Sequence, residues 1–240
     1  MSRRDSSSVL PPAGEKRGYV RRMFSVIAPR YMLMNSLMTL GQDRFWRRSV
    51  VRRCQLAPGK SLLDVATGTG DIAAEALRSE PGATVVGIDL TREMMTRGKA
   101  VHAELGVPLV EGDALTLPFP SEYFDAVCSG FLMRNVVDVP AAFAEQVRVL
   151  RPGGRLVCLE ITMPTSRVLR AGFRAYFFRV VPLLGSLVSG QREAYTYLPE
   201  SVLSFPGPRA LAHMMEACGL RDVRYQLAMF GTVALHWGTK

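Results

Sequence analysis

Short apolar runs alternate with longer amphipathic segments from about residue 61 onward. The runs have the length and composition of strands, and each is followed by a longer segment. They lie at 61–66, 84–88, 107–111, 123–129 and 155–161. Strands that alternate with helices in this way are typical of a parallel sheet covered by helices. The pattern therefore predicts an α/β fold, and no internal repeat is present.

The segment after the fourth run carries the signals of a helix at both ends. Asp138 is placed to cap its N-terminus, and Pro140 suits the first turn because its fixed φ is already helical. Apolar residues recur at helical spacing from Phe143 to Leu150, so this face is expected to pack on the sheet. The Arg-Pro-Gly-Gly run at 151–154 is predicted to end the helix.

The C-terminal part of the chain predicts one more helix and a pair of strands. A helix at about 208–217 places Leu211 and Met215 on one face and stops at Gly219, which suits the left-handed cap. The stretch 221–238 divides into two strand-like halves with a short connection, which is typical of a hairpin. The last strand is therefore expected to be antiparallel to its partner.

Length and charge limit the organisation of the chain and its partners. A chain of 240 residues is long enough for one α/β domain with a full core and too short for two ordinary domains. Residues 1–18, which hold charges, serines and prolines, are expected to form a disordered tail, and 19–240 a single domain. The net charge of +9 predicts attraction to nucleic acid or to membrane headgroups.

Two further features concern the compartment. The four cysteines stand far apart with no C-x-x-C pair, so neither a zinc site nor a redox motif is expected. The N-terminus lacks the apolar core of a signal peptide, and the most apolar stretch, 168–190, is interrupted by Arg170, Arg174 and Arg179. We therefore expect a cytoplasmic protein without a membrane span or a bound metal.

The first predicted strand runs into a glycine turn, "LLDVATGTGD", that is flanked by two acids. Asp64 ends the strand, Gly68 and Gly70 form the turn, and Asp71 begins the next helix, whose amide groups would point at a ligand. The following strand, "TVVGID", ends in Asp89, where a carboxylate can accept hydrogen bonds from both hydroxyls of a ribose. A ligand that contains a ribose is therefore predicted.

A phosphate-bearing ligand fits this turn poorly. No Gly-Lys-Ser/Thr follows it, and Ala73 stands where a dinucleotide site would have its third glycine. Two acids suit a cationic ligand, and S-adenosylmethionine (SAM) carries a sulfonium and an ammonium group. Asp113, after the third strand, is placed to accept from an adenine amine, and Thr67 and Thr69 are expected near the ligand's carboxylate. Each acid alone could cap a helix or solvate a strand end, whereas the ordered set of three favours SAM.

Five segments in chain order resemble the class I SAM-dependent methyltransferases that act on ubiquinone and menaquinone precursors. They are "LLDVATGTGD", "VVGID", "EGDALTLPFPSEYFDAV", "FLMRNVVD" and "RVLRPGGRLVCLEIT". Flanking segments such as "YTYLPESVLSFPGPRALAHMMEACGL" are also similar, so the likeness runs from about Val20 to Lys240. The resemblance implies a Rossmann-like sheet of seven strands with the terminal strand antiparallel, a helical lid at 19–58 and an inserted helical segment at 163–204.

The resemblance also implies which residues bind the cofactor. Thr69, Asp89 and the pair Asp113-Ala114 fall where the family binds SAM. The family usually has a further serine after the fourth strand, where this chain has Gly130, and Ser129 is carried over only as its neighbour. The residues expected to bind the cofactor are Asp64, Thr67, Gly68, Thr69, Gly70, Asp89, Asp113, Ala114 and Ser129.

The N-terminal signature departs from the family pattern. The family normally has Tyr-Asp-x-Met-Asn with a histidine further on, whereas this chain has Tyr31-Met32-Leu33-Met34-Asn35, and Asp43 replaces the histidine. These departures concern the acceptor and leave the cofactor site unchanged. They leave open the alternative that the enzyme methylates another small aromatic or lipid acceptor.

The reaction implied by the resemblance is methyl transfer to a ring carbon of a lipophilic polyprenyl quinol, with demethylmenaquinol as the first candidate. A phenol with a pKa of about 10 is roughly one part in a thousand ionised at pH 7, a shortfall of about 4 kcal/mol. Arg134 is the first candidate to stabilise the phenolate, Asn135 to orient its oxygen, and Tyr31 to relay a proton or stack on the ring. The structural alternatives are an ion pair, a helix cap and a core position, in that order.

Two basic stretches favour peripheral contact with an anionic membrane at its inner face. "RFWRRSVVRRC" sets arginines on one helical face and Trp46 and Val50 on another, and "RVLRAGFRAYFFRVVPLLG" sets Arg167, Arg170 and Arg174 beside aromatic residues. For the first stretch the alternative is a solvated face over a buried stripe. The motif that clamps a flipped base is missing after the fourth strand, which argues against nucleic acid. A homo-oligomer and a non-catalytic binding protein on the same fold are left open.

Overall fold

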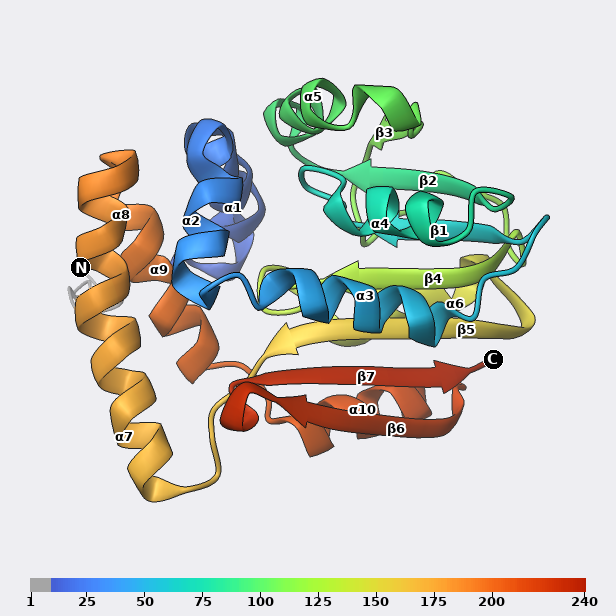
Figure 1. The fold of residues 1–240 in the computed structure, drawn as a ribbon. Coiled ribbons are helices and arrows are strands. Elements are labelled where there is room, and N and C mark those ends of the chain that lie inside the picture. The colour runs from blue at the N-terminus through green and yellow to red at the C-terminus, as the bar shows by residue number, and fades with distance from the viewer. Residues whose placement is uncertain (1–9) are drawn as a thin grey trace.

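The computed structural model describes residues 10–240 of the chain. Its centre is one sheet of seven strands in the order β3-β2-β1-β4-β5-β7-β6 (Figure 1). β7 is antiparallel to both of its neighbours, β5 and β6. The strands are β1 Ser61–Val65, β2 Thr84–Asp89, β3 Leu109–Glu111, β4 Phe124–Gly130, β5 Leu150–Ile161, β6 Arg221–Ala228 and β7 Val233–Thr239. The predicted α/β fold with seven strands and an antiparallel terminal strand is confirmed.

β5 begins earlier than the sequence pattern predicts. Leu150, expected on the face of the preceding helix, is the first residue of β5 and pairs with Phe124. The next pair joins Ala126 to Arg155, so the register shifts and 151–154 bulge out of the ladder. The Pro-Gly-Gly run therefore ends the helix as expected, but it forms a bulge inside the strand.

Ten α-helices surround the sheet in the described part of the chain. They are α1 Ala13–Ile27, α2 Tyr31–Thr39, α3 Asp43–Cys54, α4 Asp71–Ser79, α5 Arg92–Val101, α6 Val139–Val149, α7 Arg167–Ala175, α8 Val181–Ser189, α9 Arg192–Leu203 and α10 Pro208–Ala217. A π-helical turn at Tyr176–Val180 joins α7 to α8. The predicted cap of α6 is confirmed, because Asp138 Oδ1 accepts from the Ala141 amide at 2.9 Å.

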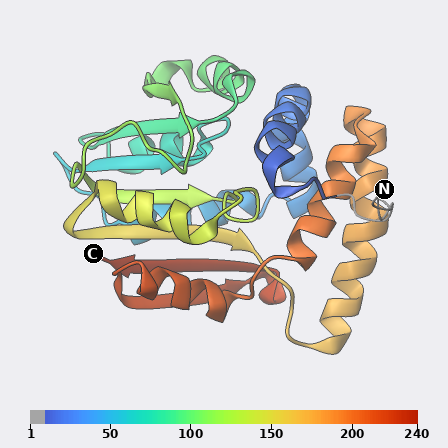
Figure 2. The same ribbon diagram turned by 180° about the vertical axis from the view of Figure 1, so that it is seen from behind.

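Helices cover both faces of the sheet (Figures 1 and 2). α3 and α4 lie on one face, and α6 and α10 lie on the other. The first face packs around the buried side chains of Trp46 and Val50, and the second around Phe143 and Leu211. Both layers leave free the edge where the parallel strands end, and this is the edge at which ligands bind in such sheets.

A cap of helices faces that edge (Figure 1, left). It consists of α1, α2, α7, α8 and α9 and has its own apolar core, which includes Met34, Phe177 and Tyr195.

The boundaries expected from the sequence differ from those in the structure. α1 begins at Ala13, so the boundary expected at residue 18 is too late, and residues 1–9 of the expected tail lie outside the described part. α3, assigned to the lid at 19–58, packs on the sheet because Trp46 and its apolar neighbours join the sheet core. The segment expected as an insertion at 163–204 contains α7, α8 and α9.

One helix in the described part of the chain, Arg167–Ser189, is long and apolar enough to cross a membrane by length and composition. The sequence pattern excluded a span here because three arginines interrupt the stretch. In the fold, one side of this helix packs against the cap and buries Phe177, Val181 and Gly185. The other side exposes Leu183 and Leu187. The helix therefore lies on the surface of the cap with one apolar side uncovered.

Candidate functional site

Two adjoining cavities lie at the carboxyl edge of the sheet, beneath the helical cap. The larger has a volume of about 190 Å³ and the smaller about 110 Å³. Ala66, Gly68, Gly130 and Asn135 line both, so the loops after β1 and β4 form a shared wall. The smaller cavity lies toward the ends of β2 and β3, and the larger extends into the cap.

The loop after β1 is held by the acid beneath it. Ala66 and Gly68 both have φ of 57°, in the left-handed region that disfavours a side chain such as that of Ala66. The buried Asp64 accepts from Thr67 Oγ1 at 2.7 Å and from the Ala73 amide at 3.2 Å. Burial raises the pKa of Asp64 to about 6 in spite of these hydrogen bonds. Asp64 lines neither cavity, so the direct contact with the ligand expected from the sequence is corrected to a role in positioning the loop.

The smaller cavity brings together the acids that follow the second and third strands. Asp89 lines it and accepts from the amides of Gly68 at 2.7 Å and Thr91 at 2.8 Å. Burial raises the pKa of Asp89, although both hydrogen bonds oppose the shift. Asp113 and Ala114 line the same cavity. With Gly68, four of the expected cofactor residues therefore meet here, from three separate loops of the chain.

α1 reaches over the smaller cavity, which the sequence did not predict. Arg17 lines the cavity, and its Nε donates to Asp113 Oδ2 at 2.6 Å. Arg21 Nη2 donates to Glu111 at 3.2 Å. Both arginines are more than half exposed, and such surface pairs contribute at most about 1 kcal/mol each. Their partners lie some ninety positions away, so no local signal in the sequence marks them.

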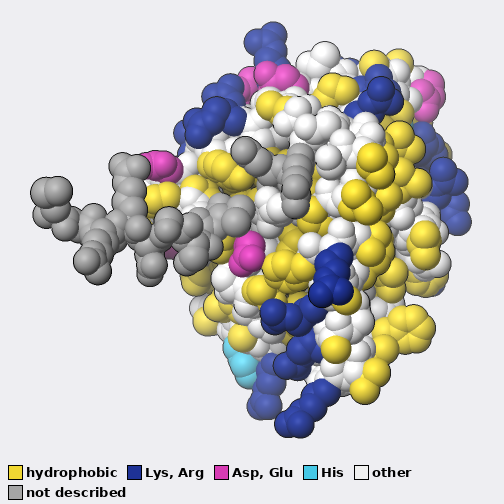
Figure 3. All heavy atoms as spheres, turned by 90° about the vertical axis from the view of Figure 1, so that its left-hand side faces the viewer, with side chains coloured by type: hydrophobic (Ala, Val, Ile, Leu, Met, Phe, Trp, Pro, Cys, Tyr) yellow, Lys and Arg dark blue, Asp and Glu magenta, His cyan; other side chains and the backbone are white. Residues whose placement is uncertain are grey.

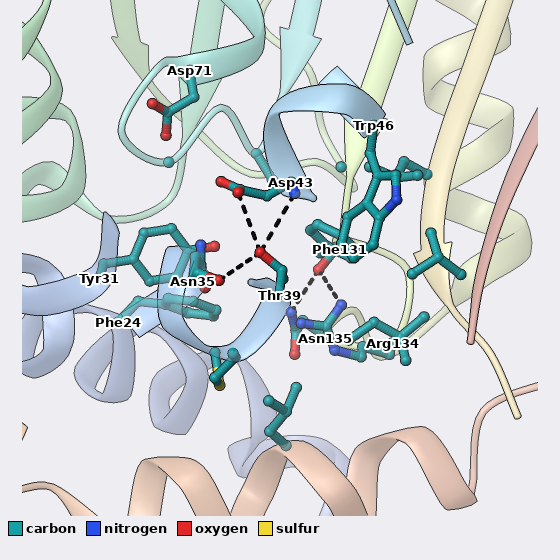
Figure 4. A pocket seen from close by; sticks show the side chains of 18 of the residues that line it. Phe24, Tyr31, Asn35, Thr39, Asp43, Trp46, Asp71, Phe131, Arg134 and Asn135 are labelled. Carbon is teal, nitrogen blue, oxygen red and sulfur yellow. Dashed lines mark hydrogen bonds between the residues drawn. The ribbon is translucent and has the colours of Figure 1, made fainter. Parts of the chain in front are cut away.

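The turn after β4 positions two of the residues predicted to act on the substrate (Figure 4). The Phe131 carbonyl oxygen accepts from Arg134 Nη1 and from Asn135 Nδ2, both at 2.9 Å. Arg134 Nη1 also donates to Glu160 Oε1 of β5 at 2.5 Å, and Asn135 Oδ1 accepts from the Tyr197 hydroxyl at 3.3 Å. Arg134 and Asn135 both line the larger cavity. Arg134 thus makes the ion pair that was its structural alternative, and this pair holds it at the cavity wall.

Tyr31 and Ser129 differ in their access to the cavities. Tyr31, at the start of α2, lines both cavities and packs edge-on against Phe24 with ring centroids 5.9 Å apart (Figure 4). Burial raises the pKa of the Tyr31 hydroxyl, so it stays protonated at neutral pH. Ser129 is fully buried in β4 and lines neither cavity, which corrects its assignment, whereas Gly130 lines both.

The larger cavity has a largely apolar wall with a polar corner formed by Asp43, Arg47 and Asp71. Thr69 lines it, and Thr69 Oγ1 donates to Asp71 at 2.6 Å. Burial pushes the pKa of Asp71 upward, but the hydrogen bond from His102 and the charge of Arg47 outweigh it and hold the pKa below its usual value. Gly70 lines neither of the two cavities and instead lets the chain turn into α4 at φ of 74°. The apolar wall includes Ile27, Met38, Phe173, Phe177 and Leu198.

Sequence reasoning missed Arg47, Glu160 and Tyr197. Arg47 stood among other arginines in a stretch interpreted as a surface, and Glu160 looked like one polar residue in a strand. Tyr197 lies more than sixty positions beyond the turn that it contacts. Their contacts become visible only when the cap is placed on the sheet.

The groups around the cavities match the parts of SAM. Asp113 and Asp89 offer carboxylates to an adenine amine and to ribose hydroxyls. Gly68 and Gly130 contribute backbone without a side chain to the shared wall, and a Cβ added at Gly130 would lie 2.8 Å from Ile72 Cδ1. Asp71 in the larger cavity supplies negative charge toward a cation.

Solved structures share this fold. A SAM-dependent methyltransferase from Thermotoga maritima matches with a TM-score of 0.63 at 18% identity, covering 92% of this chain and 99% of that one. A phosphoethanolamine N-methyltransferase from Haemonchus contortus, solved with SAM, matches with a TM-score of 0.60 at 16% identity, covering 82% and 52%. At these identities the likeness concerns the fold, which is that of the class I SAM-dependent methyltransferases.

Relatives in sequence are closer. The demethylmenaquinone methyltransferase of Roseiflexus sp. (strain RS-1) is 46% identical and covers 98% of this chain and 99% of its own. That of Thermus thermophilus is 49% identical over 91% and 100%. A ubiquinone/menaquinone biosynthesis C-methyltransferase UbiE from Desulfotalea psychrophila is 43% identical over 92% and 90%. Because the family model also matches residues 12–240, the chain belongs to the ubiE/COQ5 methyltransferase family.

Proposed function

We propose that the enzyme transfers the methyl group of SAM to a ring carbon of a polyprenyl quinol, with demethylmenaquinol as the acceptor. The larger cavity carries the proposal, because most of its wall is apolar and its polar side chains include Arg134, Asn135 and Tyr31. A fused aromatic ring with an apolar tail suits such a wall, and its oxygens suit the polar groups. The relatives from Roseiflexus and Thermus, named demethylmenaquinone methyltransferases, support this acceptor.

Arg134 is proposed to stabilise the acceptor as a phenolate. SAM, when bound, supplies a methyl group on a sulfonium. The ring carbon becomes a good nucleophile when the neighbouring phenol ionises, which is unfavourable by about 4 kcal/mol at pH 7 for a pKa of about 10. The guanidinium is fixed by Glu160 and by the Phe131 carbonyl, so its remaining N–H groups are oriented before the substrate arrives.

Asn135 and Tyr31 are proposed to orient the same ring. Asn135 uses one amide N–H on the Phe131 carbonyl and its oxygen on the Tyr197 hydroxyl, which leaves a second N–H for the substrate. Tyr31 stays protonated, so it acts as a hydrogen-bond donor or a stacking surface and not as a base. The two side chains therefore support positioning, which is a large part of the rate enhancement in a transfer reaction.

Trp46 offers a direct test of acceptor binding, because it lines the larger cavity. A quinone ring bound there is expected to quench its fluorescence. Titration of the SAM-loaded protein with a short-tailed naphthoquinone should give saturable quenching, which Trp46→Phe removes. Trp237, the other tryptophan, lies in β7 under Arg53 and serves as the internal control. Saturable quenching by benzoquinones alone would contradict the ring class, and its absence with both quinones would contradict the acceptor site.

The exposed side of α7 and α8 is proposed to contact an anionic membrane, so that the quinol tail enters without crossing water. Val168 and Leu187 are 81% and 74% exposed, and Leu183 is also uncovered. Arg167 and Arg170 are exposed on the same helix. Figure 3 shows hydrophobic side chains across this face, with lysine and arginine side chains gathered toward its lower part. Near anionic lipids each such charge contributes about 1 kcal/mol.

The basic stretch in α3 does not support membrane contact. Trp46 and Val50 are buried in the sheet core, and Arg48 lies 3.3 Å from Glu75. The alternative interpretation of this stretch, a solvated face over a buried stripe, therefore fits the fold better.

A further inference from the structure

The polar corner of the larger cavity, formed by Asp43, Arg47 and Asp71, joins α3 to α4. Arg47 Nη2 lies 2.7 Å from Asp43 Oδ2, and Nη1 lies 3.3 Å from Asp71 Oδ1. The Arg47 side chain is 20% exposed, so it reaches the cavity, while the two carboxylates are more buried. Figure 4 shows Asp43 and Asp71 on the same side of the cavity, above Tyr31. The Arg47 guanidinium therefore makes a short contact with Asp43 and a longer one with Asp71.

The charge of the corner follows from the donors around Asp71. His102 Nδ1 lies 3.3 Å from Arg78 Nη2, and an arginine can only donate, so this nitrogen accepts. His102 Nε2 therefore donates to Asp71 at 3.3 Å. Thr69 adds a neutral donor to the same carboxylate. Two carboxylates and one guanidinium leave the corner with a net charge of −1.

The position of the corner matches one end of the cofactor. Asp89 and Asp113 lie in the smaller cavity, where the nucleoside is assigned. Gly68 lines both cavities, whereas Thr69 and Asp71 line the larger and not the smaller, so a ligand passing over Gly68 reaches the corner. The remaining part of SAM is an α-amino acid with an ammonium and a carboxylate, and with its sulfonium the cofactor has a net charge of +1. The two net charges are complementary.

We propose that Arg47 binds the carboxylate of the cofactor's amino-acid end and that Asp71 accepts from its ammonium group. The cofactor carboxylate replaces the long contact between Arg47 and Asp71, while the shorter contact with Asp43 keeps the guanidinium in place. Asp43 is thereby a positioning residue. The proposal depends on the cofactor and not on the quinol acceptor, and its test needs no methyl transfer.

The test compares two nucleosides that differ at the amino-acid end. S-adenosylhomocysteine has this end, and 5′-methylthioadenosine lacks it. By isothermal titration calorimetry, Arg47→Gln is expected to weaken S-adenosylhomocysteine binding about tenfold or more, as for loss of a charge-assisted hydrogen bond, and to leave methylthioadenosine binding unchanged. Asp43→Asn should weaken only S-adenosylhomocysteine, by a smaller factor.

Arg48→Gln is the matched control, because Arg48 follows Arg47 in α3 and also faces an acid of α4, yet its side chain is 71% exposed. Both nucleosides should bind it as they bind the unchanged protein. Unchanged methylthioadenosine affinity also shows that Arg47→Gln is folded. Equal weakening of both nucleosides by Arg47→Gln, no weakening of either, or the same selective loss in Arg48→Gln would overturn the proposal.

Discussion

Arg134 is held at the cavity wall by a carboxylate on the neighbouring strand. The side chains of Arg134 and Glu160 are 7% and 1% exposed. Burying such a pair is costly unless further hydrogen bonds satisfy it, and Glu160 also accepts from the amides of Arg134 and Ile161. Glu160 therefore acts through Arg134, as a positioning residue, and has no need to touch the substrate.

Arg134→Ala is expected to lower kcat by about a hundredfold or more, as does the loss of one donor to a developing oxyanion. The affinity for S-adenosylhomocysteine should not change, because its nucleoside is assigned to the smaller cavity, which Arg134 does not line, and its amino-acid end to Arg47 and Asp71. Arg134 is instead paired with Glu160. Steady-state kinetics and calorimetry on the same preparation measure both quantities. Glu160→Gln should lower kcat with little change in the cofactor's KM. Unchanged turnover in Arg134→Ala would remove its catalytic role.

Asp64 gives stability a specific pH dependence. Its folded pKa of about 6 lies above the value near 3.9 of an unfolded aspartate, so the folded state holds the proton more tightly. Its contribution is therefore fully favourable below about pH 4 and is lost as the pH rises through about 6, a total of about 3 kcal/mol. The free energies of unfolding of the protein and of Asp64→Asn can be measured with urea from pH 4 to 7. The stability of the variant should rise relative to that of the protein as the pH rises. A constant difference across this range would contradict the shifted pKa.

Among the elements, α8 and α9 depend on a close approach at one glycine. Gly185 lies on α8 where an added Cβ would overlap the ring of Tyr195 on α9, including its Cγ at 2.5 Å. The Tyr195 ring lines the larger cavity. The geometry of this helix pair therefore shapes the wall that faces the acceptor.

Gly185→Ala is expected to destabilise the cap by about 1–3 kcal/mol through overpacking and to raise the KM for the quinol. Gly172→Ala on α7 is the matched control, because nothing lies within 4 Å of its Cβ. It should be neutral or stabilising by up to about 1 kcal/mol, since alanine favours a helix. Thermal unfolding and steady-state kinetics distinguish the two, and equal effects would show that Gly185 has no special packing role.

Elements with a strong local period were predictable from the sequence, and elements set by distant partners were not. The strands and α10 follow apolar runs and turn residues, and α6 follows its cap at Asp138. α1 begins at Ala13, before the expected boundary at residue 18, and its contacts with the smaller cavity were not predictable because Arg17 and Arg21 pair with Asp113 and Glu111, which lie some ninety positions away. The bulge at 151–154 depends on the register against β4, which no local pattern encodes.

In the candidate site, too, some residues could be predicted from local sequence patterns, and others depend on contacts between distant segments. Asp89, Asp113 and Ala114 could be placed because the ends of parallel strands meet at one edge. The sequence did not show that Asp64 lies behind its loop or that Ser129 points away from the cavities, because both depend on which side of a strand end faces the cap. The polar corner could not be predicted, because it forms only where α3 contacts α4.

At the scale of the whole molecule, the cavities open beneath a cap whose outer side is apolar and basic. The protein should sediment with vesicles that contain anionic lipid at low salt and be released at high salt, because basic side chains act through screened charge. Leu183→Gln combined with Leu187→Gln should weaken this binding. Tyr123→Gln, at an exposed residue that precedes β4, is the control and should bind as before. Equal binding to neutral vesicles, or no effect of the double variant, would contradict docking through α7 and α8.

The most direct test of the central claim is the position of the transferred methyl group. The purified protein would be incubated without oxygen with methyl-labelled SAM and a panel of reduced demethylated naphthoquinols and benzoquinols, and the products analysed by mass spectrometry with fragmentation. We expect label on a ring carbon of the naphthoquinol, at a rate that Arg134→Ala reduces. Label on an oxygen, or no labelled quinol from a protein that binds SAM, would contradict the proposed reaction and direct attention to another small aromatic or lipid acceptor.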